Sequence, residues 1–374
     1  MSPKISPLFL FLCLSVGMIC SCSKNTSSTP TPTPTPTPAP TLAVSAINPT
    51  HGSVGDTVTI TGSDFGTSPS LDSVWLNGKM APVINAGATQ LQVTVPSLCG
   101  TGTVKVSTSG HAASGPIFTY DTTYTLTTFA TGLNNPQYLT IDGAGNLYVT
   151  NFGNGTIAKI SSAGSVSTFA SGLNGPTGIT IDANSNIYVS TNNNMNVSTI
   201  YKITPSGTAG SFANITGYVY GLTIDNSGNL YAANAGTGAI SIITSSGTVS
   251  TFASGMPSIS GIAFSSNGNL YATGTTNGAV YKITPGGAVT DVFNGFSFGG
   301  QNGIAVDNND NLYITVFGNN TLTQYNTITK INASGTITTL TTGLDDPCGL
   351  IIDVNGNFYV VNTIAATVSK LTVQ

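Results

Sequence analysis

The chain has 374 residues, of which 44 are glycine and only 6% are charged. All nine cationic residues are lysine and all thirteen acidic residues are aspartate, so the sequence contains no arginine and no glutamate. Without arginine the protein lacks the usual bidentate ligand for phosphate, and a net charge of -4 repels a polyanion. The composition therefore argues against nucleic-acid binding and favours strands joined by tight turns around a large core.

Residues 1–22 are predicted to form an export signal, because the apolar run from Leu8 to Ile19 is too short for a stable membrane span. The run leads into Cys20-Ser21-Cys22, which resembles a bacterial lipobox with a small residue directly before Cys22. The resemblance implies that Cys22 is lipidated and that lipid anchors the exported protein to a membrane of the cell envelope, at the periplasmic face or the cell surface. An ordinary signal peptide cleaved nearby is the alternative.

Residues 23–41 are rich in serine and threonine and then alternate proline with threonine. Proline at every second position prevents both helix and sheet formation, so we expect an extended linker of the polyproline type. Such a segment would hold the following domains away from the membrane.

Residues 42–121 show short alternating apolar runs separated by glycine and proline, which is typical of a small β-sandwich. The order of motifs, from Ile47-Asn-Pro-Thr-His-Gly through Gly62-Ser-Asp-Phe-Gly66, resembles an IPT/TIG domain, an immunoglobulin-like module. Trp75 is interpreted as a core residue in preference to a binding anchor. His51 and His111 lie beside glycine in predicted turns, and their wide separation does not predict a metal site.

Residues 122–374 contain one apolar pattern six times, each copy ending in a tyrosine. These tyrosines are 40, 43, 40, 42 and 46 residues apart, a period typical of β-propeller blades. In the third copy we expect strands at Leu222–Asp225, Leu230–Ala233, Ala239–Ile243 and Thr248–Phe252. The predicted fold is therefore all-β, with an Ig-like β-sandwich followed by a six-bladed β-propeller.

An aspartate ends the first strand in five of the six copies, and Ser265 replaces it in the fourth. Aspartate can accept hydrogen bonds from the backbone that follows it, so we interpret these residues as turn formers. A ring of carboxylates for catalysis or metal binding is the alternative. The repeated tyrosines are expected to pack within the blades, and Lys159, Lys202, Lys282, Lys330 and Lys370 share one position of the third strand, so their charges spread around the ring.

The copies resemble NHL-type propeller blades, most clearly at Pro176-Thr-Gly-Ile-Thr-Ile-Asp182 and Pro347-Cys-Gly-Leu-Ile-Ile-Asp353. The aspartate that often follows the second strand in that family is missing here, as is the arginine of the third strand. The sixth copy ends after its third strand, whereas Tyr124–Phe129 precedes the first copy and matches a fourth strand. We therefore predict that this early strand completes the last blade and closes the ring.

The candidate ligand site lies in the loops at the channel mouth, before each first strand and after each second strand, where the copies differ. These loops carry amides and aromatic rings, which suit the hydroxyls and flat faces of a neutral glycan. The alternative is that asparagine and aromatic residues only stabilise the loops. Gln137 and the acidic pair Asp345-Asp346 lie in the same loops. The candidate ligand-binding residues are Tyr138, Asn151, Phe152, Tyr220, Asn234, Asn302, Phe317 and Asn362.

We predict no catalytic residues and no metal ligands in the propeller, because it has no histidine, glutamate or arginine and the lone Cys348 has no base beside it. Cys348 is interpreted as a small buried residue. The leading hypothesis is a lipid-anchored binding protein that captures a neutral glycan or a protein partner. One alternative is a Ca²⁺-dependent lactonase or lyase, because gluconolactonase and regucalcin-type enzymes use similar propellers; Ca²⁺ is otherwise unsupported, and no cofactor is predicted. A second alternative is a structural scaffold in an envelope assembly.

Overall fold

The computed structural model describes residues 41–194, 196–296, 302–317 and 326–374. The predicted signal, Cys22 and nearly all of the predicted linker lie outside these residues. Strands dominate the described part of the chain, which has one short 3₁₀ turn, η1 (Pro69–Leu71), and no long apolar helix of the kind that crosses a membrane. The prediction of an all-β protein with an Ig-like sandwich and a six-bladed propeller is confirmed.

The first domain is a sandwich of a four-stranded sheet, in the order β1-β3-β7-β6, and a five-stranded sheet, in the order β2-β9-β8-β4-β5. Its core contains Val58, Ile60, Leu76 and Phe118, which are fully shielded from solvent. The strands are β1 (Ala43–Asn48), β2 (His51–Gly52), β3 (Thr57–Ser63), β4 (Asp72–Leu76), β5 (Lys79–Ala81), β6 (Val83–Gly87), β7 (Gln90–Thr94), β8 (Gly102–Thr108) and β9 (His111–Tyr120).

The prediction that Trp75 belongs to this core is wrong. Strand β4 alternates, and its neighbours Val74 and Leu76 are the residues that face the core, so Trp75 lies on the opposite face of the sheet. Its ring is half-buried beneath Lys105, whose Nζ lies 5.5 Å from the ring centroid. The indole is therefore covered by a lysine side chain in place of core residues.

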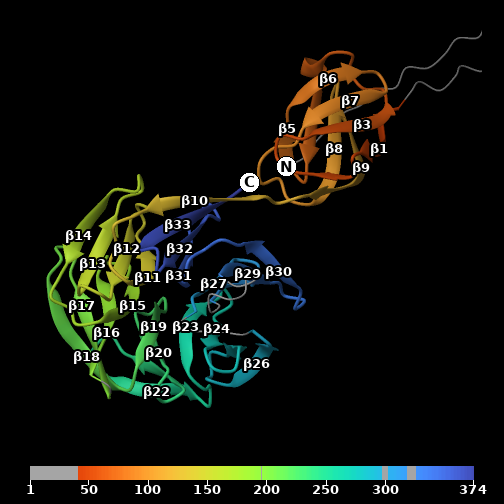
Figure 1. Cartoon of the computed structure of the whole chain (residues 1–374). Helices are drawn as coiled ribbons and strands as arrows, with labels where there is room; N and C mark the ends of the chain where they lie inside the picture. The colour runs from red at the N-terminus through yellow and green to blue at the C-terminus, as the bar shows by residue number, and fades with distance from the viewer. Residues whose placement is uncertain (1–40, 195, 297–301, 318–325) are drawn as a thin grey trace, which may run out of the picture. The chain divides into compact units, whose positions relative to one another are not determined.

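The second domain is a ring of six four-stranded sheets (Figure 1). In each blade the first strand lines the central channel. The strands of the first three blades are β11 (Pro136–Ile141), β12 (Leu147–Asn151), β13 (Thr156–Ile160), β14 (Val166–Ala170), β15 (Pro176–Ile181), β16 (Ile187–Asn194), β17 (Val197–Ile203), β18 (Ala209–Thr216), β19 (Val219–Ile224), β20 (Leu230–Asn234), β21 (Ala239–Ile243) and β22 (Val249–Ser254). The remaining strands are β23 (Ile259–Phe264), β24 (Leu270–Gly274), β25 (Ala279–Ile283), β26 (Val289–Asn294), β27 (Ile304–Val306), β28 (Leu312–Val316), β29 (Thr327–Ile331), β30 (Ile337–Thr341), β31 (Pro347–Ile352), β32 (Phe358–Asn362), β33 (Thr367–Val373) and β10 (Tyr124–Ala130).

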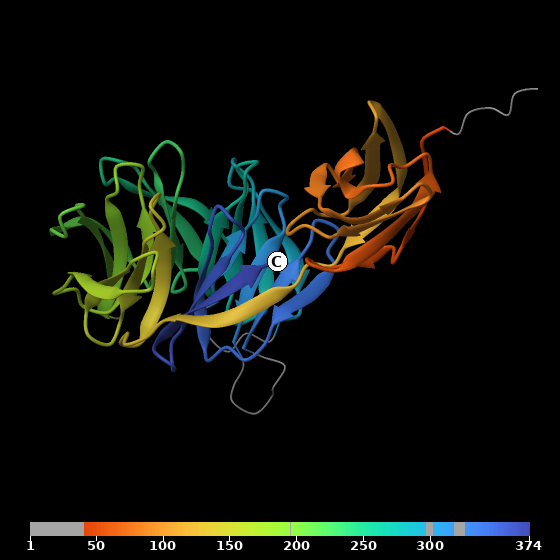
Figure 2. The same cartoon turned by 90° about the horizontal axis from the view of Figure 1, so that it is seen from above.

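Strand β10 closes the ring as predicted. It pairs antiparallel with β33, with Tyr124 opposite Val373 and Thr127 opposite Lys370, and the last blade has the order β10-β33-β32-β31. Figures 1 and 2 show the gold strand β10 running beside the blue strand β33. The closing blade therefore takes three strands from the end of the propeller sequence and one, β10, from its beginning. Strand β10 is the outer strand of this blade, as β14 is in the first blade.

The turns between first and second strands confirm the structural role of the repeated aspartates. The Asp225 Oδ1 accepts hydrogen bonds from the backbone N–H groups of Ser227 at 2.9 Å and Asn229 at 2.8 Å. Its Oδ2 accepts from the Asn229 side chain at 2.9 Å and from the Tyr231 hydroxyl at 3.4 Å. The backbone and asparagine bonds recur at Asp142, Asp182, Asp307 and Asp353.

The repeated tyrosines and lysines pack against one another within the blades, as the sequence predicts. Lys159 Nζ lies 5.3 Å from the ring centroid of Tyr148, and the same pairing recurs in three further blades at 5.3 to 5.6 Å. A phenylalanine also meets the ring from the side, as Phe169 does at 4.9 Å from Tyr148. The repeated charges and rings are therefore used in holding the blades together.

Candidate ligand-binding site

Loops that precede first strands and loops that follow second strands meet at one end of the channel and enclose a cavity of about 330 Å³, here called the mouth cavity. Hydroxyl, amide and aromatic groups line it, together with one carboxylate and one thiol. Positive charge is lacking among these described lining residues. They are Gln137, Tyr220, Ser258, Thr275, Phe317, Asp346, Cys348 and Thr363.

Two short hydrogen bonds fix hydroxyls in the wall of the mouth cavity. The hydroxyls of Ser258 and Thr275 lie 2.7 Å apart, which ties the loop before β23 to the loop after β24. Thr363 donates to the carbonyl oxygen of Pro136 at 2.9 Å and also lies 3.2 Å from Cys348 Sγ. The bond to Pro136 joins the last blade to the first where the ring closes.

Cys348 is a buried thiol, as the sequence predicts. Burial raises the pKa of Cys348 to about 12, although the hydrogen bond from Thr363 favours the thiolate and opposes part of that rise. The thiol is therefore uncharged at neutral pH, and its residue is only 4% exposed. It serves the cavity as a small apolar surface and not as a nucleophile.

Asp346 is the one carboxylate among the described residues that line the mouth cavity. Burial raises the pKa of this carboxyl, and the negative charge of the adjacent Asp345 raises it further. A partly desolvated carboxylate in an uncharged wall is a strong hydrogen-bond acceptor, since water competes less for it. It would accept well from the hydroxyl of a bound molecule.

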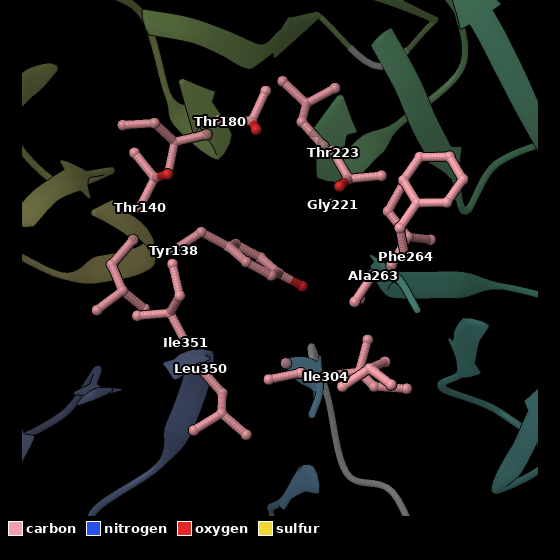
Figure 3. Close-up of a pocket in the computed structure, with 18 of the residues that line it drawn as sticks. Tyr138, Thr140, Thr180, Gly221, Thr223, Ala263, Phe264, Ile304, Leu350 and Ile351 are labelled. Atoms are coloured by element: carbon pink, nitrogen blue, oxygen red, sulfur yellow. The ribbon is translucent and has the colours of Figure 1, made fainter. Parts of the chain in front are cut away.

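Tyr138 forms the boundary between the mouth cavity and the deeper channel. Five of the six blades have glycine at this position of the first strand: Gly178, Gly221, Gly261, Gly303 and Gly349. A β-carbon at Gly178 would lie 2.0 Å from the carbonyl oxygen of Tyr220, so the close approach of neighbouring blades requires glycine there. The first blade alone carries a side chain, and Figure 3 shows the Tyr138 ring crossing the channel.

Of the eight predicted site residues, two line the mouth cavity and six do not. Tyr220 and Phe317 line the mouth cavity, and Tyr138 lies below it in the channel. Asn302 is fully buried between blades, where its backbone N–H donates to the Ser260 hydroxyl at 3.1 Å. Phe152 is 40% exposed and does not line the mouth cavity.

The other three predicted residues, Asn151, Asn234 and Asn362, use their side chains within the protein. Asn151 Oδ1 accepts from the Asn134 backbone at 3.2 Å, and Asn362 Oδ1 accepts from Asp345 in the same way. Asn234 donates to the Thr216 carbonyl at 2.7 Å and accepts from the backbone of Gly236. These three amides are at most 5% exposed and hold the mouth loops in place.

Sequence reasoning passed over Ser258, Thr275 and Thr363, because hydroxyl residues are abundant in this chain and give no local signal. It named Asp346 only as a member of the acidic pair Asp345-Asp346 and not as a candidate ligand-binding residue. The available signal was the position of Asp346 just before β31 and of Cys348 at its start, which brings both to the same mouth as Gln137.

Comparison with known proteins supports both domains. Residues 42–126 match the IPT/TIG domain family, and residues 256–282 match a β-propeller repeat family. No curated protein matches the sequence significantly.

Several solved structures share the fold. A structural genomics protein of unknown function from Bacteroides thetaiotaomicron has 17% identity and a TM-score of 0.61, covering 90% of this chain and 99% of its own. An auxiliary nutrient binding protein from the same species has 16% identity and a TM-score of 0.56, covering 89% and 97%. A gluconolactonase from Xanthomonas campestris has 11% identity and a TM-score of 0.55, covering 67% and 89%. At these identities the similarity establishes the fold alone.

Proposed function

We propose that this chain is a binding protein of the bacterial cell envelope whose propeller captures a neutral glycan in the mouth cavity. The observation that carries the proposal is the lining of that cavity. Two aromatic rings, Tyr220 and Phe317, share it with the Gln137 amide, three hydroxyl residues and the Asp346 carboxylate. Rings pack against the apolar faces of sugars, while amides, hydroxyls and carboxylates bond to sugar hydroxyls.

The size of the cavity also suits this class of ligand. A volume of about 330 Å³ lies at the lower end of small-molecule sites, so the cavity can hold the end of a glycan but not a folded partner. A binding role also agrees with the name of one structural neighbour, the auxiliary nutrient binding protein.

A glycan-array screen with purified full-length protein tests the proposal. We expect Tyr220→Ala and Phe317→Ala each to weaken binding of a captured glycan about tenfold, because each removes one stacking surface. Val354→Ala is the matched control, since Val354 is fully exposed on a turn outside the mouth cavity. Binding that is equal in the wild type and both aromatic variants would refute the mouth site. If no glycan binds and only the wild type captures a stoichiometric protein, the ligand of the propeller is a protein and not a glycan.

The lactonase alternative requires a metal that the mouth is poorly suited to hold. Ca²⁺ takes six or more oxygen ligands, usually including several carboxylates, and Asp346 is the one carboxylate among the described residues of the mouth cavity. Within the described ranges, no three His, Cys, Asp or Glu residues form a group that could hold a metal. Thermal stabilisation by Ca²⁺ together with lactone turnover would replace the binding proposal by the enzymatic one.

The proposed envelope location depends on Cys22. If lipid at Cys22 anchors the protein, Cys22→Ser should move it from the membrane fraction to the soluble fraction, and labelling with a fatty-acid analogue should be lost. Unchanged membrane association of that variant would contradict the anchor while leaving the glycan proposal intact.

A further inference from the structure

Below Tyr138 the channel holds a second cavity of about 260 Å³, here called the inner cavity, which lies away from the mouth loops. The second halves of all six first strands line it. Figure 3 shows Thr140, Thr180 and Thr223 on one side of the Tyr138 ring and Ile304 and Leu350 on the other. No charged side chain occurs among its described lining residues. A charged ligand would therefore lose its water without gaining a partner.

The backbone at Tyr138 is held firmly in place, so the position of its ring is well defined. Its N–H donates to Thr150 Oγ1 at 3.0 Å, and its carbonyl oxygen accepts from the same hydroxyl at 3.2 Å. On the other side, Gly349 packs so closely that a β-carbon there would lie 2.7 Å from Tyr138 Cα. The phenol can therefore only project into the channel, where Figure 3 shows its oxygen directed toward Ala263.

The Tyr138 hydroxyl is buried and has no hydrogen-bond partner among the described residues. Burial raises the pKa of Tyr138 well above its usual value, and the Ser260 hydroxyl close to the phenol lowers it only in part. The Ser260 hydroxyl is itself engaged with the next blade, donating to the Asn302 carbonyl at 3.2 Å and accepting from the Asn302 N–H at 3.1 Å. The phenol thus remains a proton donor that lacks an acceptor.

The Tyr138 ring packs in the apolar cluster of the first two blades, but this packing does not use its hydroxyl. The five equivalent glycines are required by neighbouring backbone. Tyr138, 8% exposed as a residue, adds a phenol hydroxyl to a cavity whose other described polar side chains are Thr140, Thr180 and Thr223. A mostly apolar wall with a few polar groups is the usual form of a small-molecule site.

We propose that the inner cavity binds a small uncharged molecule with an apolar body and one acceptor oxygen, to which the Tyr138 hydroxyl donates. The site is separate from the proposed glycan site, because the two cavities share no described lining residue. Its ligand must be smaller than a drug-sized molecule, since the cavity volume is below the usual range for such ligands.

Ligand-observed saturation-transfer NMR of the full-length protein tests this proposal with cyclohexanone, which has one acceptor oxygen, and cyclohexene, which has none. We expect cyclohexanone to bind wild type and Tyr138→Phe to weaken that binding about tenfold, while binding of cyclohexene is unchanged. Phe317→Ala should retain cyclohexanone binding although it weakens glycan capture, so failure of one proposal is distinguishable from failure of the other.

Thermal unfolding gives a readout that does not depend on the probe. Tyr138→Phe should unfold at or above the wild-type temperature, because it removes a hydroxyl that lacks a partner. Tyr148→Phe is the matched control and should unfold below it, since the Tyr148 hydroxyl donates to Asp142 at 3.3 Å. The proposal is overturned if cyclohexanone does not bind wild type, which would mean a cavity holding only water. Equal binding to Tyr138→Phe, or a comparable loss of stability in both variants, would also overturn it.

Discussion

At the turn end of the blades, five of six copies place an aspartate in the same set of hydrogen bonds, and lysine and tyrosine repeat in the same way beside it. At the mouth, the residue just before the channel glycine differs in every copy. It is Gln137, Thr177, Tyr220, Ser260, Asn302 or Cys348. Repetition marks the residues that every blade needs in order to fold. Variation marks positions where one blade can change without disturbing the others, and the mouth cavity lies among these positions.

Both ends of the blades depend on the closed ring, so opening the ring is expected to have the largest effect on stability. Deleting residues 122–129 removes most of β10 and its pairing with β33. We expect the propeller to lose its cooperative thermal transition, because β33 would become an unpaired edge over an exposed apolar cluster. A deletion of equal length at residues 30–37, in the predicted linker, should leave the transition unchanged. An unaltered melting temperature after loss of β10 would contradict the role of closure.

A substitution in the repeated turn should cost less stability than opening the ring, yet far more than one at an exposed aspartate outside these turns. Asp225→Ala removes the acceptor for two backbone N–H groups and one asparagine amide, so we expect a loss of about 2–3 kcal/mol in the free energy of unfolding. Asp291→Ala, at an exposed strand position outside these turns, is the control and should change stability by less than about 0.5 kcal/mol. Chemical denaturation measures both.

In the fourth blade the converse substitution, from serine to aspartate, can be made in the same turn. Its turn has Ser265, which donates to the Asn269 carbonyl at 3.1 Å where the other blades have a carboxylate acceptor. Ser265→Asp should stabilise the protein by about 0.5–1 kcal/mol, because it restores an acceptor for the turn N–H groups. A destabilising result would show that this blade has adapted to serine.

The smallest effect on stability is expected for a substitution of Asp346 in the mouth cavity, and this effect depends on pH. Burial and Asp345 raise the pKa of Asp346 in the folded protein. The stability associated with its neutral form is therefore fully present below the unfolded pKa and is lost as pH rises through the folded pKa. Asn resembles the neutral form, so Asp346→Asn should match wild type in strongly acidic buffer and be more stable at neutral pH. Denaturation curves across this range test the sign, and a variant less stable than wild type at neutral pH would contradict it.

The strands and their closure were predictable because they follow from patterns repeated along the chain. In the third copy the predicted Ala239–Ile243 agrees with β21, whereas the first strand starts earlier than predicted, at Val219, and ends one residue earlier, at Ile224. The site was harder to predict because it depends on side-chain direction. Sequence alone does not distinguish Asn234, whose amide holds the backbone of its own loop, from Tyr220, whose ring lines the cavity.

Trp75 and Tyr138 are two residues whose side-chain positions could not be predicted from the sequence. A large apolar residue in a strand predicts burial in a core, but Trp75 falls on the outer face of an alternating strand. Tyr138 was expected at the mouth, and its projection into the channel depends on its neighbours being glycine in all five other blades. Both outcomes depend on contacts between segments far apart in the sequence, which local patterns do not encode.

Closure by β10 also determines how the propeller would respond to mechanical force. Strand β10 connects to everything that precedes the ring, so tension applied from the N-terminal side enters the propeller at Tyr124. Within its sheet β10 is held only by β33, whereas β33 is held by both β10 and β32. The load is therefore carried by the hydrogen bonds of a single strand pair. Under tension we expect the ring to open at this seam first, while the remaining five blades are still folded.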